Sequence, residues 1–295
     1  MPELAWLRIA LSGLVLLSGM LGVMTTPSLA EVAELGAPLR GPAPYSPTGA
    51  DLSYPQCGLP LPFDQAFAVV GLNYGRDNTL NPCFGEELSW AALQTTGDSP
   101  EPDVSVYLNT GDPGNSYLGE LVSDWPSAGI TPFGSCLAAR LSLHFPASGQ
   151  VSLSCAYQYG FLKATQDLAW LRVAAARDNL PTAPAAYPIW LDVETSNSWE
   201  SATELNVADL QGMVAALQGS GVTAIGVYAL PAQWQAITGG ANSLAFGSFP
   251  GLKDWILGAD SLQAAQAECS QPPFVGSAVA LAQFPTGTFD GDYGC

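Results

Sequence analysis

The sequence predicts an α/β fold, a single (β/α) TIM-type barrel that occupies residues 54–295. Short apolar segments alternate along the chain with segments of helical periodicity. Most of the apolar segments lack the alternation of a half-exposed strand, which indicates parallel strands covered on both faces. About seven such segments fall within one domain-sized stretch, and that number favours closure into a barrel. An open, doubly wound sheet is the alternative, although the chain has no glycine-rich dinucleotide motif or P-loop.

The expected strands and helices alternate along this domain. One helix ends at Gly219 and Gly221, and another begins at Pro231, a residue type favoured in the first helical turn. The expected strands are 67–73, 103–110, 151–160, 188–194, 223–230, 253–259 and 277–284, and the expected helices are 86–93, 163–179, 206–221 and 231–240.

Residues 1–30 are predicted to be a signal peptide. A basic residue precedes an apolar run at 9–24, and Ser28 and Ala30 supply the small residues of a cleavage site. Because the run is short for a membrane span and no stop-transfer charges follow it, we expect cleavage after Ala30 and secretion of the mature protein. An uncleaved membrane anchor is the alternative. Residues 31–53 are rich in proline, glycine and alanine and are predicted to form a short linker.

The charge balance restricts the possible partners. The chain carries 26 acidic and 8 basic residues, a net charge of −18. No cluster of lysine and arginine is present, so the footprint of a nucleic-acid-binding protein is missing, and anionic membrane surfaces are disfavoured for the same reason. We therefore expect a neutral partner, no nucleic acid, and no membrane association after signal cleavage. We also expect a monomer.

Six cysteines follow the predicted signal peptide, which indicates disulfide bonds in an exported chain. Fifteen pairings are possible, and proximity in sequence alone favours Cys57–Cys83, Cys136–Cys155 and Cys269–Cys295. No CxxC pair is present, which argues against zinc and redox chemistry. His144 is the single histidine, so a histidine-rich zinc site is impossible and a serine or cysteine hydrolase would depend on that residue. We expect no metal and no cofactor.

Two carboxylates end the apolar segment 188–194. Asp192 and Glu194 are separated by one valine, and residues i and i+2 of a strand point to the same face. At the carboxyl end of a barrel strand, where such folds place active sites, the two charges would repel, which raises one pKa and leaves the other group ionised. Glycoside hydrolysis requires this division between a proton donor and a charged carboxylate. A helix cap, a structural cation site or an acceptor of backbone N–H groups is the alternative role for the motif.

Aromatic residues gather at or near the ends of predicted strands. Rings with a polar tip suit the apolar faces of sugars, which indicates a carbohydrate-binding cleft, whereas each ring taken alone is more often core packing. The candidate substrate-binding rings are Tyr157, Tyr159, Tyr228 and Trp234, and Tyr107 and Trp199 occupy similar places.

Four segments of the chain resemble glycoside hydrolase family 25, the lysozyme-type N-acetylmuramidases. In order they read AYQYGFLKATQDLAWL, PIWLDVETSNSW, GVTAIGVYALPAQWQAITG and ALAQFPTGTFDGDYGC. The chain is more similar still to secreted bacterial glycoside-hydrolase-like domains that are related to this family. The resemblance implies an irregular β/α barrel that cleaves an N-acetylated glycan, peptidoglycan above all, by carboxylate acid catalysis.

The same resemblance implies roles for individual residues. Glu194 matches the family's general acid, and Asp192 matches its partner carboxylate, which orients the substrate N-acetyl group or stabilises the positive intermediate. Asp290 resembles the acid that the family places near its C-terminal strand. Tyr228 and Trp234 resemble residues that line the cleft.

One position departs from the family pattern. The family has an aspartate at the end of its first strand, in a DVS-like motif, and Asn73 stands at that place in the first strand predicted here. Asn73 can hydrogen-bond a substrate but cannot carry charge, and Asp77 could replace the aspartate only if the loop folds back. This departure supports an alternative function, a non-catalytic carbohydrate- or cell-wall-binding protein on a degenerate barrel. An exported structural or interaction protein is a third alternative.

Overall fold

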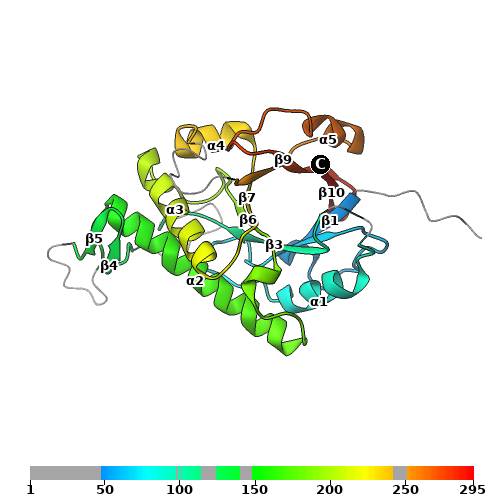
Figure 1. The fold of residues 1–295 in the computed structure, drawn as a ribbon, viewed down its shortest axis with the longest axis horizontal. Coiled ribbons are helices and arrows are strands. Elements are labelled where there is room, and N and C mark those ends of the chain that lie inside the picture. Colours follow the sequence, from blue (N-terminus) through cyan, green and yellow to red (C-terminus); the bar gives the residue numbers. More distant parts are fainter. Residues whose placement is uncertain (1–47, 98, 100, 114–123, 140–147, 242–250) are drawn as a thin grey trace, which may run out of the picture. The chain divides into compact units, whose positions relative to one another are not determined.

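The chain forms a closed, eight-stranded barrel with helices outside the ring of strands (Figure 1). The computed structural model describes residues 48–97, 99, 101–113, 124–139, 148–241 and 251–295, which fall in the unit Pro44–Cys295. The predicted signal peptide, the linker up to residue 47 and His144 lie outside the described residues. The α/β barrel expected from the sequence is therefore confirmed.

Strand β10 runs antiparallel to both of its neighbours, β1 and β9, and the remaining neighbouring strands of the barrel are parallel. Around the barrel the order is β1, β10, β9, β8, β7, β6, β3, β2. The strands are β1 (Thr48–Leu52), β2 (Ala68–Gly71), β3 (Val104–Asn109), β6 (Ile189–Asp192), β7 (Ile225–Ala229), β8 (Lys253–Ile256), β9 (Val279–Pro285) and β10 (Asp290–Gly294).

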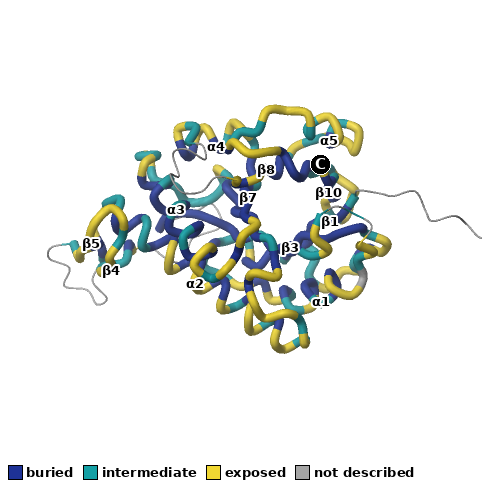
Figure 2. The backbone as a smooth tube through the Cα atoms, viewed as in Figure 1, coloured by how far each residue is buried: buried dark blue, intermediate teal, exposed yellow. Residues whose placement is uncertain are grey.

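The helices bury one side against the outer faces of these strands, and the strands are the most deeply buried part of the tube in Figure 2. Between β3 and α2 lies a separate two-stranded hairpin. The helices are α1 (Phe84–Gln94), α2 (Leu153–Arg177), α3 (Thr203–Gly219), α4 (Pro231–Thr238) and α5 (Leu262–Glu268), with short 3₁₀ turns at Tyr54–Gln56 and Pro184–Ala186, and the hairpin strands are β4 (Ala128–Thr131) and β5 (Gly134–Leu137).

The barrel begins earlier than the sequence predicted. Thr48–Leu52 forms β1, so the boundary between linker and barrel lies before residue 48 and not at residue 53. This strand pairs in parallel with β2 and antiparallel with β10 at the other end of the chain. Its short sequence, in a segment rich in proline and glycine, resembles a linker because the partners that make it a strand are remote in sequence.

The prediction of a strand at 151–160 is wrong, because most of this segment is the first part of α2, which begins at Leu153. Ser152 caps this helix, and its hydroxyl accepts a hydrogen bond from the Cys155 amide at 3.3 Å. The apolar residues of the segment face a cluster with Trp125 and Leu205 at helical spacing. The other predicted strands and helices coincide with observed elements, whereas β1, the β4–β5 hairpin, α5 and β10 were not predicted.

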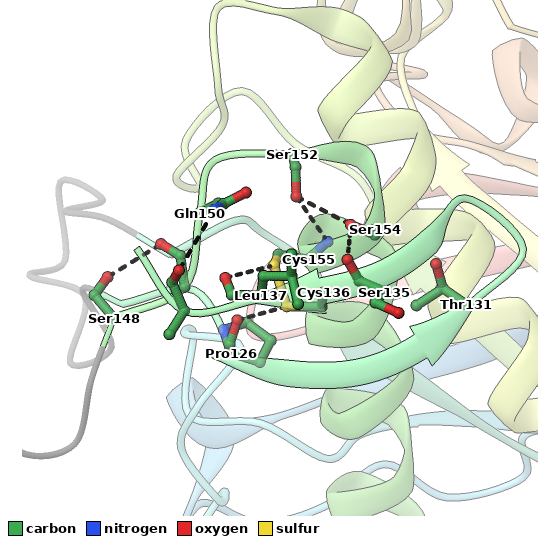
Figure 3. Close-up of a disulfide and its surroundings, with 12 residues drawn as sticks. Pro126, Thr131, Ser135, Cys136, Leu137, Ser148, Gln150, Ser152, Ser154 and Cys155 are labelled. Carbon is green, nitrogen blue, oxygen red and sulfur yellow. Dashed lines mark hydrogen bonds between the residues drawn. A yellow bond between two sulfur atoms is a disulfide. The ribbon is translucent and has the colours of Figure 1, made fainter. Parts of the chain in front are cut away.

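The three disulfides join Cys57 to Cys83, Cys136 to Cys155 and Cys269 to Cys295, which confirms the pairing of neighbours in sequence. The second bond fastens the β4–β5 hairpin to the first turn of α2 (Figure 3). Beside it, the Ser154 hydroxyl donates to the Ser135 carbonyl at 3.1 Å. Along the described part of the chain, no helix combines the length and apolar character needed to cross a membrane.

Helices α2 and α3 approach each other closely where glycines face the partner helix. A Cβ atom added to Gly160 would lie 2.0 Å from the Asp209 carbonyl oxygen, and one added to Gly212 would lie 1.9 Å from the Tyr157 carbonyl oxygen. The absence of side chains at both positions therefore sets the distance between the two helices.

We expect Gly160→Ala to lower the free energy of unfolding by roughly 1–3 kcal/mol, because the helices must move apart to admit the methyl group. Urea unfolding followed by circular dichroism measures the change. Gly219→Ala is the matched control, since nothing lies within 4 Å of a Cβ atom at that position of α3. Equal midpoints for the two variants would contradict the close helix contact.

Candidate active site

A cavity of about 140 Å³ opens at the end of the barrel where the parallel strands finish. Its walls come from the ends of β1, β3, β6, β7, β8 and β9 and from the start of the reversed strand β10. Active sites of parallel barrels lie at this end. The side chains that dominate it are the carboxyls Asp51, Asp192, Glu194 and Asp290, the rings of Tyr107, Tyr228 and Trp255, and the amide of Gln283.

Asp192 is the last residue of β6 and is 4% exposed. One of its carboxyl oxygens accepts a hydrogen bond from the Asn109 side chain on the adjacent strand β3, while the other has no partner among the described residues. Burial, and then the charges of Glu194 and Asp51, raise the pKa of Asp192 well above its usual value. The protonated form of Asp192 is therefore favoured more strongly than it is in water.

Glu194 lies just beyond β6 and lines the same cavity as Asp192, as expected from their spacing. Burial raises the pKa of Glu194, and a hydrogen bond with the Gln233 side chain opposes this shift. The amide oxygen of Gln233 accepts from the Leu230 N–H at 3.0 Å, so the amide nitrogen is left to donate to Glu194. Trp199 fixes the backbone, because its indole N–H donates to the Glu194 carbonyl at 2.8 Å.

Asp51, in β1, brings a carboxyl from the opposite side of the barrel. It pairs across the β1–β10 ladder with Asp290, and one of its oxygens accepts from the Gln283 amide at 2.7 Å. Burial raises the pKa of Asp51 to about 7, the hydrogen bond from Gln283 lowers it, and the charge of Asp290 raises it. Of the buried aspartates in this cavity, Asp51 thus has a pKa that allows it to ionise near neutral pH.

Asp292 adds a further carboxyl inside the barrel. It is fully buried, and its Oδ1 accepts from the Trp255 indole N–H at 2.7 Å, which fixes one wall of the cavity. Burial and the charge of Asp51 raise the pKa of Asp292 well above its usual value.

No lysine, arginine or histidine is among the described residues that line this cavity. The one ion pair within the described ranges, Lys163–Asp167 at 2.7 Å, lies on α2 and does not reach the cavity walls. Burial is the main cause of the raised pKa values of these carboxyls, and no cation in the cavity lining opposes it. Over the same ranges, no three His, Cys, Asp or Glu side chains are grouped so as to hold a metal ion.

Four of the predicted site residues meet at the cavity: Asp192, Glu194, Asp290 and Tyr228. The Tyr228 hydroxyl donates to the Gln283 amide oxygen at 2.9 Å, and its ring packs on Trp255 with the centroids 4.4 Å apart.

Tyr157, Tyr159 and Trp234 do not line the cavity. The two tyrosines lie on α2, where the Tyr159 hydroxyl donates to Asp77 at 2.7 Å and the Tyr157 ring packs on Phe133. Trp234 is 1% exposed within the core beneath α4. Tyr157 and Tyr159 were placed near a strand end that is in fact a helix, and Trp234 faces inward from its helix.

Asn73 also lies outside the cavity, in the loop after β2. It is fully buried, its amide nitrogen donates to the Thr79 carbonyl at 3.0 Å, and its oxygen accepts from the Asn109 N–H at 2.9 Å. Its polar atoms therefore stabilise the loop that supports β3 and Asn109. The assignment of Asn73 to the first strand was wrong, because β2 is the second strand of the barrel.

The first strand, β1, ends in Asp51 and Leu52 and is followed by Ser53, a sequence similar to the DVS-like motif. The aspartate expected at the first strand is thus present, and it reaches the cavity. The alternation of Asp51 and Ser53 with Leu52 was the available signal, and the linker-like composition around it concealed the strand. Trp255 and Gln283 were not predicted as site residues. The strands expected at 253–259 and 277–284 do not end in a pair of acidic residues, which was the signal that identified Asp192 and Glu194.

Comparisons with known proteins return lysozymes. The family model described as Lysozyme-like protein 1 matches residues 182–249, which run from before β6 to beyond α4. No curated protein matches the chain significantly.

Several solved structures are similar in fold. A muramidase from Trichobolus zukalii is 14% identical, with 84% of this chain and 93% of that chain covered and a TM-score of 0.44. A lysozyme from Streptomyces coelicolor is 12% identical, with 85% and 93% covered and a TM-score of 0.44. The spore cortex lytic enzyme SleM from Clostridium perfringens is 13% identical, with 87% and 69% covered and a TM-score of 0.47. Identities and TM-scores this low do not carry a function from those proteins to this chain, so a function has to be argued from the residues of the cavity.

The raised pKa values predict that the protein is more stable in acid than at neutral pH. For Asp51 the stabilisation is complete below its ordinary pKa of 3.8 and is lost as the pH rises through about 7, because the unfolded chain releases its proton first. We expect the free energy of unfolding to fall by at least about 2 kcal/mol between pH 4.5 and 7.5. Urea unfolding at the two pH values measures it.

The variant Asp51→Asn should show a smaller loss over the same range, because it removes one of the titrating groups. Exposed Asp64, which lies outside the cavity, provides the control Asp64→Asn. A free energy of unfolding that rises from pH 4.5 to 7.5 in the unsubstituted protein would contradict this electrostatic description.

Proposed function

We propose that this protein is a secreted glycoside hydrolase that cleaves an N-acetylated glycan, with peptidoglycan as its substrate. The observation that carries the proposal is the barrel-mouth cavity, in which carboxyls with raised pKa values face one another between aromatic walls. Two carboxyl groups in different protonation states on either side of a glycosidic bond are the requirement for its hydrolysis.

Glu194 acts as the general acid. It is only partly buried, at the rim of the cavity, so its proton can reach the leaving oxygen of a bound glycan. The raised pKa favours the protonated form of Glu194, and the hydrogen bond from Gln233 stabilises the carboxylate after the proton has been given away. The same residue can then recover a proton from the attacking water.

Asp192 and Asp51 act on the sugar from within the barrel. Asp192 is held by Asn109 and has a second oxygen without a partner, which suits it to orient the substrate N-acetyl group or to stabilise the positive intermediate. Asp51 ionises near neutral pH and supplies negative charge from the opposite wall, where Asp290 adds a further carboxyl.

The aromatic rings supply the surface on which a sugar ring packs. Tyr107 and Tyr228 contact Trp255 with ring centroids 6.1 and 4.4 Å apart, and all three line the cavity. Such rings bind the apolar face of a pyranose, while their polar ends stay hydrogen-bonded. Because the cavity lining lacks basic residues, a neutral sugar fits it better than an anionic one.

Two sequence comparisons support the same function. The segment matched by the lysozyme-like family model contains Asp192 and Glu194, and the resemblance to glycoside hydrolase family 25 assigns these residues the same roles. The alternative of a carbohydrate-binding protein without activity rested on Asn73 as the first-strand residue. With Asp51 at the end of the first strand, that reason no longer applies.

An exported protein is consistent with the three disulfides, since such bonds persist in oxidising compartments. We propose that residues 1–30 direct export and are removed, and that the mature protein acts as a monomer without a metal or cofactor.

The variant Glu194→Gln should reduce glycan hydrolysis by 10²-fold or more, because general acid catalysis contributes about that factor. Release of reducing ends from purified peptidoglycan, with chitin oligosaccharides assayed alongside, measures it. Glu204→Gln, an exposed change on α3 outside the cavity, is the matched control and should retain activity. Activity of Glu194→Gln near that of the unsubstituted protein would reject Glu194 as the acid, and binding without hydrolysis by the unsubstituted protein would favour the binding function.

The variant Asp51→Asn should also lose about 10²-fold or more of the hydrolytic rate, since it removes the carboxyl that ionises at neutral pH. The side chain is nearly isosteric and can still meet Gln283, so the fold should be retained. Near-normal rates of Asp51→Asn over the whole pH range would show that Asp51 takes no part in the reaction.

A further inference from the structure

We propose that Gln283 and Tyr228 form a positioning pair for Asp51, which stabilises the ionised form of this carboxyl through one oxygen and leaves the other oxygen to the substrate. This inference rests on the proposed function for its role in catalysis, whereas its structural part concerns the state of Asp51 alone. The pair links three strands, since Tyr228 is in β7, Gln283 in β9 and Asp51 in β1.

Two hydrogen bonds in series define the pair. The Tyr228 hydroxyl donates to Oε1 of Gln283 at 2.9 Å, and Nε2 of Gln283 donates to Oδ2 of Asp51 at 2.7 Å. A glutamine amide has one accepting end and one donating end, and here each end has a partner of the matching kind. The two contacts therefore define a single orientation of the Gln283 side chain.

The Asp51 carboxylate, which can only accept, sets that orientation, and Tyr228 supports it by donating to the amide oxygen. Burial, and then the charges of Asp51 and Asp192, raise the pKa of the Tyr228 hydroxyl, so it stays protonated and able to donate. If the Gln283 amide were reversed, its oxygen would face the Asp51 carboxylate, and the two acceptors would repel. The reversed amide would also leave Asp51 without this donor.

Tyr228 is itself held in place. Its ring packs on Trp255 with the centroids 4.4 Å apart and the planes at 57°. The indole N–H of Trp255 donates to Asp292 at 2.7 Å, which fixes the ring on which Tyr228 rests. The donor that reaches Asp51 is thus anchored through packed side chains inside the barrel.

The groups around Asp51 show why a neutral donor matters there. The charges of Asp290 and Asp292 on β10 and of Asp192 on β6 interact unfavourably with an ionised Asp51, and the phenols Tyr107 and Tyr228 supply no positive charge. Gln283 is the side chain that lowers the pKa of Asp51 against this background. Because the amide occupies Oδ2, the other oxygen is left for the substrate.

The test follows the titration of the Asp51 carboxyl by carbon-13 NMR in the full chain, together with the pH dependence of glycan hydrolysis. Gln283→Met removes the donor at similar size, and Tyr228→Phe removes a single oxygen and preserves the ring. We expect the pKa of Asp51 to rise by about one unit in Gln283→Met and by less in Tyr228→Phe, because a lost hydrogen bond to a charged group has about that effect. The acidic limb of the rate profile should move to higher pH by the same amount.

Matched controls are Gln65→Met and Tyr187→Phe, which remove an amide and a hydroxyl whose partners, the Phe63 and Pro181 carbonyls, lie outside the cavity. Both should leave the titration of Asp51 unchanged. An unchanged titration in both Tyr228→Phe and Gln283→Met would overturn the proposal, and if Gln283→Met does not fold, Tyr228→Phe decides alone. Shifted titrations in a protein that hydrolyses no glycan would support the positioning pair and reject the proposed function instead.

Discussion

The reversal of β10 is the constraint on which the candidate site depends. Because β10 runs antiparallel between β1 and β9, its first residues lie at the end of the barrel where the parallel strands finish. The β1–β10 ladder places Asp290 opposite Asp51, and the β10–β9 ladder places Asp292 opposite Gln283. The pairing of β10 with β1 therefore both closes the barrel and brings Asp51 and Asp290 together. The first and last strands of the barrel thus form one wall of the cavity.

Neutral amides, and not cations, balance the carboxyls of this cavity. An amide donor stabilises the ionised form of a carboxyl by less than a salt bridge would, so it opposes the raised pKa without holding the group in its charged form. That property suits residues that must give and recover a proton or carry charge only during the reaction. Each of the carboxyls proposed to act has one such donor: Asn109 for Asp192, Gln233 for Glu194 and Gln283 for Asp51.

The sequence allowed prediction of those parts of the fold that local patterns determine. The apolar run of β6 and the spacing of Asp192 and Glu194 were enough to predict a strand and two carboxyls in one cavity. β1 was not predictable in this way, because it is a strand through pairing with residues remote in sequence, and without it Asn73 was given the place of Asp51. Tyr159 was misplaced for a related reason: its segment is apolar, and only the Ser152 cap and the packing of α2 make it helical.

A crystal structure of the Glu194→Gln variant with an oligosaccharide of alternating N-acetylglucosamine and N-acetylmuramic acid would show whether the barrel-mouth cavity is the active site. We expect a sugar ring against Tyr228 and Trp255, with its N-acetyl group within hydrogen-bond distance of Asp192 and a glycosidic oxygen beside residue 194. A glycan bound elsewhere on the molecule, with the barrel-mouth cavity empty, would contradict the assignment of this cavity as the active site.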